Sequence, residues 1–175
     1  IKNLSYLSEG TISLLELHTH ERRAIKKYLP MYDPKIIFKD TRIKFIKSKS
    51  DQIIELNGLV KLSNKFNNFK IKNKYNSNKM SFDIKGIADL TDSIVNVPKI
   101  NYVKKQGEKS ELDFDVNFIM NKSYYIKELK FFNDKTKIYL SNLKLNKNLE
   151  TIDFNKLEIK TFLNGVKNND FSINK

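Results

Sequence analysis

The residues best suited to bind a metal ion are His18 and His20, the two histidines of the chain. On a strand their i, i+2 spacing would place both imidazoles on one face, whereas on a helix they would diverge. The nearest carboxylates are Glu16 and Glu21, and the chain has no cysteine, so a third ligand has no defined position. We interpret the pair as surface histidines and predict no metal site.

A second candidate is the acidic alternation Asp113, Asp115 and Asn117, which resembles the start of a calcium-binding loop. Such a loop needs Gly at its sixth position and Glu at its twelfth, but Phe118 and Tyr124 occupy those positions. The acidic residues also alternate with apolar ones, which is typical of the solvated side of a strand. We therefore predict no calcium site here.

The remaining sequence offers little support for catalysis. The five glycines stand apart, so there is no glycine-rich phosphate loop. Without cysteine, zinc ribbons, thiol chemistry and disulfide scaffolds are excluded, and no credible Ser-His-Asp set is present. Asp83, Glu111 and Asp153 are explained as outward residues of strands or turns. We expect neither an enzyme nor a cofactor.

Composition is the next constraint. The chain has 175 residues, 39% hydrophobic, and 33 Lys plus Arg against 20 Asp plus Glu, a formal net charge of +13. Only Arg22, Arg23 and Arg42 are arginines, and the lysines are scattered along the chain. Proteins that read phosphates or bases usually recruit the bidentate arginine fork. We therefore expect no specific nucleic-acid partner and keep non-specific binding as a third hypothesis.

The elements that would position any site divide near Pro30 and Pro34. Residues 1–34 form an N-terminal segment in which an approximate i, i+3, i+4 pattern predicts a short helix over 21–29, ended by Pro30. The stretch 11–17 is also compatible with a strand. Residues 35–175 are expected to form one antiparallel β-sheet segment.

After Pro34 apolar and polar residues alternate with a period of two, which indicates half-buried strands with one apolar face. Short Asn-, Gly- and Asp-rich links separate about nine or ten strands and leave no room for crossover helices, so an antiparallel meander is predicted. The parity slips near 141–142 and 155–156, where we expect β-bulges. The candidate strands are 54–62, 69–75, 80–90, 112–120, 36–47, 93–104, 124–132, 136–145, 152–163 and 171–173.

The apolar face of such a sheet needs a cover. Nine strands ~4.8 Å apart span ~43 Å, and the resulting apolar surface exceeds the few hundred Å² that soluble monomers usually expose. Three covers are compatible with the alternation: closure into a sandwich or barrel, packing of the N-terminal helix, or contact with lipid acyl chains. A sandwich or barrel is the commonest solution among all-β proteins, and a closed binding or scaffold module is therefore our alternative hypothesis.

Three stretches carry a family resemblance. The first is the YLP segment at 28–30, which precedes the strands. The second is INYVKKQGEKS at 100–110, which contains an aromatic-x-Lys-x-x-Gly turn and leads into the alternating residues 112–118. The third is KIYLSNLKL at 137–145, which is followed by IDF at 152–154 and by NDFSI at 169–173. Together they resemble the AsmA-like superfamily, the YhdP- and TamB-type proteins of Gram-negative envelopes. The resemblance covers most of 28–173 and only loosely 1–27. The richness in Lys and Asn suggests an AT-rich alphaproteobacterium.

The resemblance implies a long, curved, taco-shaped sheet whose hydrophobic groove carries phospholipid between the inner and outer membranes, supporting outer-membrane homeostasis. It implies a periplasmic location and an inner-membrane anchor outside this stretch. Because the sequence begins with Ile1, we expect it to be internal to a longer chain. It implies phospholipid acyl chains as partners, with no catalytic residue, metal or cofactor. The residues expected to line the groove are Leu56, Val60, Leu62, Ile71, Phe82, Ile84, Ala88, Leu90, Leu112, Phe114, Val116, Phe118, Ile126, Ile138 and Leu140.

Overall fold

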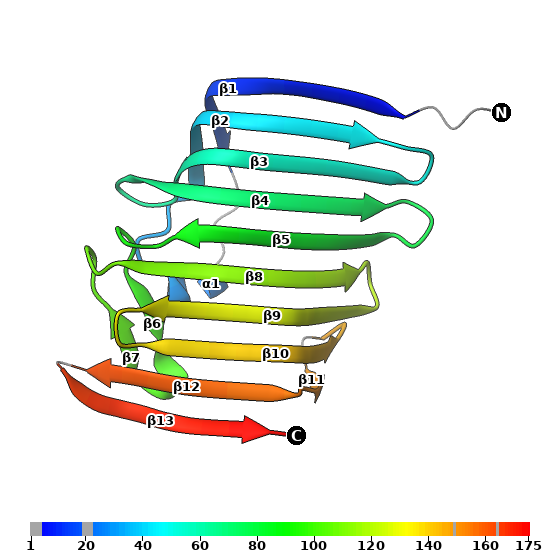
Figure 1. The fold of residues 1–175 in the computed structure, drawn as a ribbon. Helices are drawn as coiled ribbons and strands as arrows, with labels where there is room; N and C mark the ends of the chain where they lie inside the picture. The colour runs from blue at the N-terminus through cyan, green and yellow to red at the C-terminus, as the bar shows by residue number, and fades with distance from the viewer. Residues whose placement is uncertain (1–4, 19–22, 149, 164) are drawn as a thin grey trace.

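The computed structural model describes residues 5–18, 23–148, 150–163 and 165–175. Almost every element is a strand, as the alternation predicts (Figure 1). The elements are β1 (Tyr6–His18), α1 (Arg23–Tyr28), β2 (Lys35–Lys47), β3 (Asp51–Lys61), β4 (Phe66–Asn76), β5 (Ser81–Asp89), β6 (Val95–Val97), the 3-10 turn η1 (Pro98–Ile100), β7 (Tyr102–Lys104), β8 (Ser110–Ile119), β9 (Ser123–Asn133), β10 (Lys137–Asn146), β11 (Thr151–Asp153), β12 (Lys156–Leu163) and β13 (Val166–Asn174).

The strands form one 11-stranded antiparallel sheet in the order β1-β2-β3-β4-β5-β8-β9-β10-β12-β13, with β11 paired to β10. Most neighbouring strands follow each other along the chain and are joined by short turns. Longer segments join two neighbouring pairs: the one with α1 connects β1 to β2, and the one with β6, η1 and β7 connects β5 to β8. The sheet is open: β1 and β13 are its two edges, and in the described part of the chain they pair with nothing beyond β2 and β12. The predicted antiparallel meander is confirmed, and the sheet is not closed into a barrel.

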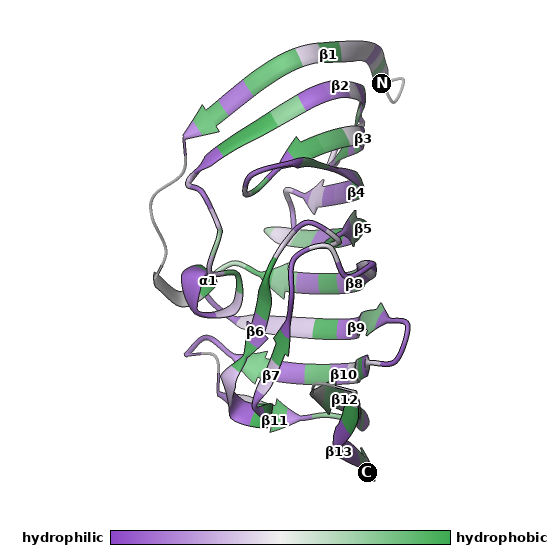
Figure 2. Ribbon diagram, turned by 90° about the vertical axis from the view of Figure 1, so that its left-hand side faces the viewer, coloured by the Kyte–Doolittle hydropathy of each residue, from purple (hydrophilic) through white to green (hydrophobic). Residues whose placement is uncertain are grey.

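The sheet is also curved. Seen along its edge, β1, β2 and β3 bend toward the side that carries α1, β6, β7 and β11 (Figure 2). A curved, open sheet with one short helix is thus the architecture, and it has one concave side on which the smaller elements gather. The same side carries the apolar residues, as shown below.

The structure corrects three sequence predictions. Residues 93–104, expected to form one strand of the meander, instead form β6, η1 and β7, a separate two-stranded hairpin. The sheet begins at Tyr6 rather than at residue 35, because β1 pairs with β2 over almost its whole length. The predicted helix is present as α1 (Arg23–Tyr28) but ends one residue before Leu29, and residues 21–22 of the predicted range lie outside the described residues.

Irregular positions lie where the apolar parity changes. In β10, Asn142 adopts a left-handed conformation with φ 54°, at the predicted place. At 155–156 the chain does not bulge; β11 ends and β12 begins after a two-residue break. A further bulge was not predicted: Asp40 (φ 46°) and Thr41 of β2 together face Gly58 of β3.

Candidate functional site on the apolar face

Most apolar residues of the sheet lie on one face, where they align into four rows that cross the strands. We number the rows from the end nearest β6 and β7. Directly paired residues of neighbouring strands share a face, so the registers define each row. The first row is Phe69, Ala88, Leu112, Phe131, Ile138 and Ile159; the second is Ile43, Leu56, Ile71, Gly86, Phe114, Leu129, Leu140 and Leu157; the third is Phe45, Ile54, Asn73, Ile84, Val116, Ile126 and Leu143; the fourth is Tyr75, Phe82, Phe118 and Tyr124.

The second row stays continuous across Gly86, which has no side chain. The ring of Phe114 fills that gap: a Cβ added at Gly86 would lie 2.7 Å from Phe114 Cζ. The third row contains one polar residue, Asn73, between Ile54 and Ile84, and its Oδ1 is buried without a hydrogen-bond partner. Apart from Asn73, the rows present only apolar and aromatic groups over eight consecutive strands.

The first row is covered. Leu90, Val95, Tyr102 and Phe131 form the buried core cluster, in which Val95 belongs to β6 and Tyr102 to β7. Leu29, directly after α1, and Ile100 of η1 pack against it. The partly buried residues packed against this cluster include Ala88, Leu112 and Ile138 of the first row. Within the described residues, the cluster does not extend to the second, third or fourth row.

The uncovered rows are only half-buried. Ile84, Phe114, Val116 and Ile126 lie in the middle of the sheet, yet all four keep partial solvent exposure. In a closed sandwich, residues at such positions are fully buried between two sheets. Neighbouring side chains of the same layer shield each other here, but among the described residues no second layer covers them.

The segment over the first row is held by Lys104, whose side chain is completely buried. Its Nζ donates hydrogen bonds to the carbonyl oxygens of Leu90 (2.6 Å), Thr91 (2.9 Å) and Ser93 (2.6 Å). The Thr91 carbonyl also accepts from the backbone N–H of Gly107, at φ 85°. All three ammonium protons are therefore used, which compensates for the burial of the charge. Burial lowers the pKa of Lys104, and nearby carboxylates oppose this shift.

Tyr102 completes this arrangement. Its ring is 2% exposed and meets Phe131 edge-on, with centroids 6.1 Å apart, while Asn133 Nδ2 donates to its hydroxyl oxygen at 3.2 Å. Burial raises the pKa of this phenol. The aromatic-x-Lys-x-x-Gly turn of the sequence corresponds to Tyr102, Lys104 and Gly107. In the structure these residues hold the segment between β5 and β8 against the sheet.

The opposite face of the sheet is polar and laced with cross-strand ion pairs. Lys127, in the bulge of β9, lies 3.1 Å from Asp83 Oδ1 and 3.5 Å from Asp115 Oδ1, and Lys85 pairs with Asp115 at 2.7 Å. Burial acts to raise the pKa of Asp83, but hydrogen bonds from Lys127 and Asn117 outweigh it and lower the pKa. Comparable pairs join Lys72 to Glu55 and Lys137 to Glu158. The two faces thus differ in chemistry: the rows are almost entirely apolar, whereas ion pairs are concentrated on the opposite face.

Thirteen of the fifteen residues predicted to line a groove lie on the apolar face; besides the row members these include Val60, which shares the parity of Leu56 in β3. Leu62 and Leu90 do not lie in strands: Leu62 follows β3, and Leu90 follows β5 and joins the core cluster. The sequence prediction of the lining omitted several residues of the four rows, although they lie in strands that the alternation predicts. These are Ile43, Phe45, Ile54, Phe69, Tyr75, Tyr124, Leu129, Phe131, Leu143, Leu157 and Ile159.

The candidate metal ligands are not assembled. His18 is exposed at the end of β1, with Nε2 2.8 Å from Glu16 Oε1, and Glu16 also pairs with Lys35. His20 lies outside the described residues. Asp113, Asp115 and Asn117 are on the polar face of β8. In the part of the chain that the structure describes, no three His, Asp or Glu side chains are grouped to hold a metal ion, and no helix is long and apolar enough to cross a membrane.

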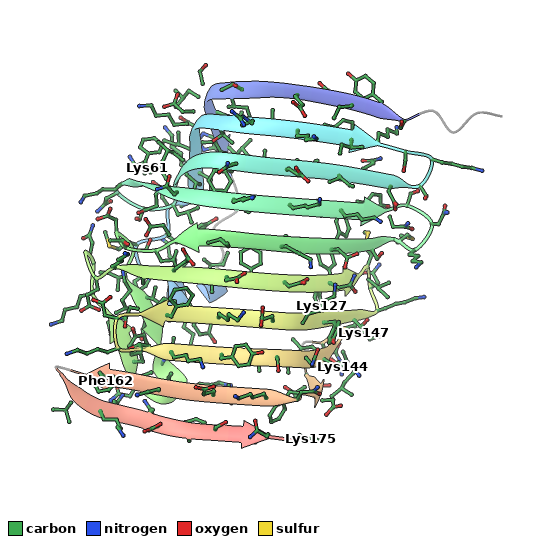
Figure 3. All side chains as sticks on the ribbon, in the orientation of Figure 1. Lys61, Lys127, Lys144, Lys147, Phe162 and Lys175 are labelled. Atoms are coloured by element: carbon green, nitrogen blue, oxygen red, sulfur yellow. The ribbon has the colours of Figure 1, made fainter. Side chains whose placement is uncertain are left out.

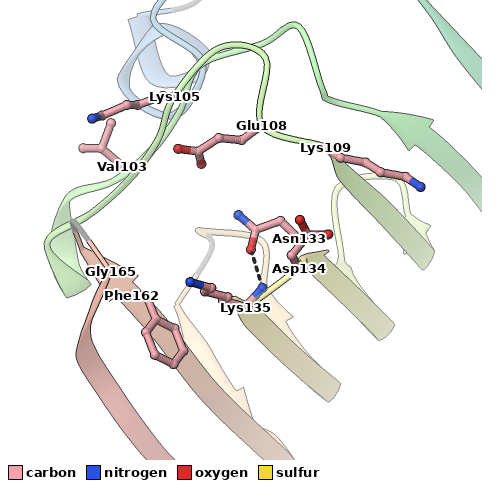
Figure 4. A pocket seen from close by; sticks show the side chains of 9 residues that line it. All are labelled: Val103, Lys105, Glu108, Lys109, Asn133, Asp134, Lys135, Phe162 and Gly165. Carbon is pink, nitrogen blue, oxygen red and sulfur yellow. Dashed lines mark hydrogen bonds between the residues drawn. The ribbon is translucent and has the colours of Figure 1, made fainter.

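One hollow lies at the edge of the sheet between the β7–β8 loop and the β9–β10 and β12–β13 turns, with a volume of about 280 Å³ (Figure 4). Its lining is mostly long charged side chains, among them Lys105, Glu108 and Lys135, with Phe162 on one side. Asn133 Oδ1 accepts a hydrogen bond from the backbone N–H of Lys135 at 3.1 Å. Such an exposed, charged lining carries no acid-base or nucleophile pair.

Comparisons with known proteins add no relative. No family model matches this chain, and no curated protein or solved structure is significantly similar to it. The resemblance to the AsmA-like superfamily therefore rests on the sequence patterns above and stays a prediction.

Proposed function

We propose that the apolar face binds phospholipid acyl chains and that the protein is a segment of a lipid-conducting β-sheet in the bacterial cell envelope. One observation carries the proposal: three rows of apolar side chains cross the open sheet without a covering layer. A surface of this size in water is unfavourable by about 25 cal/mol for each Å² of apolar area. An apolar ligand that covers the rows removes this cost.

The direction of the rows suits such a ligand. A row crosses the strands, so it runs along the long dimension of the sheet, ~4.8 Å for each strand. Eight strands give a path of roughly 34 Å, longer than one acyl chain. Because acyl chains need only apolar contact, a chain shifted along a row meets similar surroundings at every strand. Movement along the sheet then requires no specific polar site and no catalytic residue.

The envelope location and the transfer of phospholipid between the two membranes come from the sequence resemblance, and we include them in the proposal. The structure supports the proposal at the level of surface chemistry, through an apolar concave side and an ion-paired opposite side. A closed sandwich or barrel is not formed, so a filled interior is no longer available as the cover of the apolar face.

Photo-crosslinking tests the proposal. A benzophenone amino acid placed at Ile84 or at Phe114 reports on the uncovered rows, and the same probe at Lys85 or Asp113 reports on the polar face of the same two strands. We expect phospholipid adducts, detected by mass spectrometry, from the first two positions and not from the second two. Organic extraction of the purified protein should release co-purified phospholipid. A lipid-free protein with no adduct at Ile84 and Phe114 would contradict the proposal.

A further inference from the structure

The turns at one end of the strands form a surface that the proposed acyl-chain site does not use. We name it the basic rim and define it as Lys49 of the β2–β3 turn, Lys79 and Met80 of the β4–β5 turn, Met120 and Lys122 of the β8–β9 turn, and Lys147 of the β10–β11 turn. These turns succeed one another along the right-hand side of Figure 1, and Lys147 is labelled there in Figure 3.

Backbone hydrogen bonds join the first three turns of the basic rim, and the β10–β11 turn with Lys147 follows them at the same end of the strands. Ser77 N–H donates to the Ser50 carbonyl at 2.8 Å and joins the first two turns. Met120 N–H donates to the Met80 carbonyl at 3.1 Å and joins the second to the third. The lysines that project from these turns therefore keep a fixed spacing.

The lysines of the basic rim are not held in close ion pairs. Among the described residues, none of Lys49, Lys79, Lys122 and Lys147 forms an ion pair, and all four are exposed. Asp51, the carboxylate nearest to Lys49 in sequence, is held by Lys74 at 3.0 Å and by Asn76 Nδ2 at 2.6 Å, and Lys79 interacts with it only over a longer range. The rim is thus a row of free ammonium groups, one from each turn.

Apolar side chains stand between these lysines. Met80 and Met120 are 49% and 42% exposed, and Tyr124, the outer member of the fourth row, is 37% exposed. Flexible thioethers and a tyrosine beside lysines are suited to the boundary between headgroups and acyl chains, where the apolar part enters and the charged part stays at the surface. Nucleic acid would match the charge but not the methionines.

We propose that the basic rim binds the surface of an anionic phospholipid bilayer, with the lysines at the headgroup phosphates and Met80 and Met120 inserted between headgroups. The fourth row begins directly behind these turns, so the docked rim would place the aromatic end of the apolar face next to the bilayer. Apart from Tyr124, which belongs to the fourth row, the proposal rests on other residues than the acyl-chain proposal, and either can fail without the other.

Vesicle co-sedimentation tests it, with the whole chain and vesicles of phosphatidylcholine alone or mixed with phosphatidylglycerol, at an ionic strength of about 0.1 M. The rim variant is Lys49→Gln with Lys79→Gln and Lys122→Gln. The matched control, Lys105→Gln with Lys109→Gln and Lys135→Gln, removes the same charge from exposed lysines at the opposite ends of the strands. Circular dichroism and urea midpoints check that both variants fold.

Each lysine near an anionic surface contributes roughly a fivefold gain in partitioning, so the rim variant should bind the mixed vesicles at least tenfold and up to about a hundredfold more weakly. The control should lose less than about threefold. Met80→Ser with Met120→Ser should weaken binding that persists at high salt. Equal losses in rim and control variants would show an effect of net charge alone and overturn the proposal. No binding of the unmodified protein to mixed vesicles, or its complete displacement from them by duplex DNA, would overturn it too.

Discussion

Phe82 of β5 and Phe118 of β8 lie directly opposite each other, with ring centroids 4.6 Å apart and an interplanar angle of 14°. Tyr75 continues the stack on one side at 4.6 Å, and Tyr124 continues it on the other at 6.0 Å. Four neighbouring strands therefore present one aromatic strip at the end of the apolar face. Stacked pairs of this kind contribute about 0.5–1.5 kcal/mol beyond the area they bury.

We expect Phe118→Ala to lower the free energy of unfolding by about 2 kcal/mol, because it removes a half-buried ring and its contacts with two neighbours. Urea denaturation measures the change. Phe132→Ala, an exposed phenylalanine on the other face, is the matched control and should cost less than about 1 kcal/mol. A double-mutant cycle with Phe82→Ala should give a coupling of about 1 kcal/mol; additive effects would contradict the stacking argument.

Lys104→Met should be among the most destabilising substitutions outside the rows. It leaves the carbonyl oxygens of Leu90, Thr91 and Ser93 without their shared donor in a buried site, at a cost of about 3 kcal/mol or more. Hydrogen exchange should show the loss first in β6 and β7. The adjacent, exposed Lys105→Met should change stability by less than about 0.5 kcal/mol. A small effect of Lys104→Met would mean that another group satisfies these carbonyls.

The sequence was sufficient to predict the strands and their inward residues where the alternation is strict. In β5 and β8, Phe82, Ile84, Phe114 and Val116 follow from the period of two alone, since side chains on alternate positions must share a face. The same rule selects Leu56 and Ile71. Thirteen of fifteen proposed lining residues lie on one face for this reason.

The rest depended on contacts between distant segments. Val95, Val97, Tyr102 and Lys104 alternate like sheet residues, so periodicity gave no sign that they form a separate hairpin over the first row. Lys104 was the sequence signal for this difference. It stands at a position whose parity points inward, and a charge buried there must find hydrogen-bond acceptors. Whether the apolar face is open or covered is also a long-range property, and the alternation is identical in both cases.

Stability should fall as the pH drops below about 4. The pKa of Asp83 lies below its ordinary value of 3.8 because hydrogen bonds from Lys127 and Asn117 outweigh the effect of burial. The unfolded chain then binds the proton more readily, so this contribution is complete above the ordinary pKa and is lost as the pH falls through the lowered one. Asp83→Asn should flatten the acid limb of a plot of unfolding free energy against pH, whereas Asp134→Asn, at an exposed turn, should leave it unchanged. Parallel acid limbs for Asp83→Asn and the unmodified protein would contradict the assignment.

Gly58→Ala tests the bulge that bends β2 toward the concave side. A Cβ at Gly58 would lie 2.5 Å from Thr41 Cα and 2.9 Å from the Asp40 carbonyl oxygen. Both are backbone atoms that cannot turn aside, and Thr41 is fully buried. We expect a loss of about 2–3 kcal/mol in unfolding free energy. Gly10→Ala on β1 is the matched control, since its Cβ would meet only Ile43 Cγ2 at 3.8 Å, and it should be neutral within about 0.5 kcal/mol. Equal effects of the two substitutions would show that β2 can straighten at Asp40 without cost, and the curvature would then need another origin.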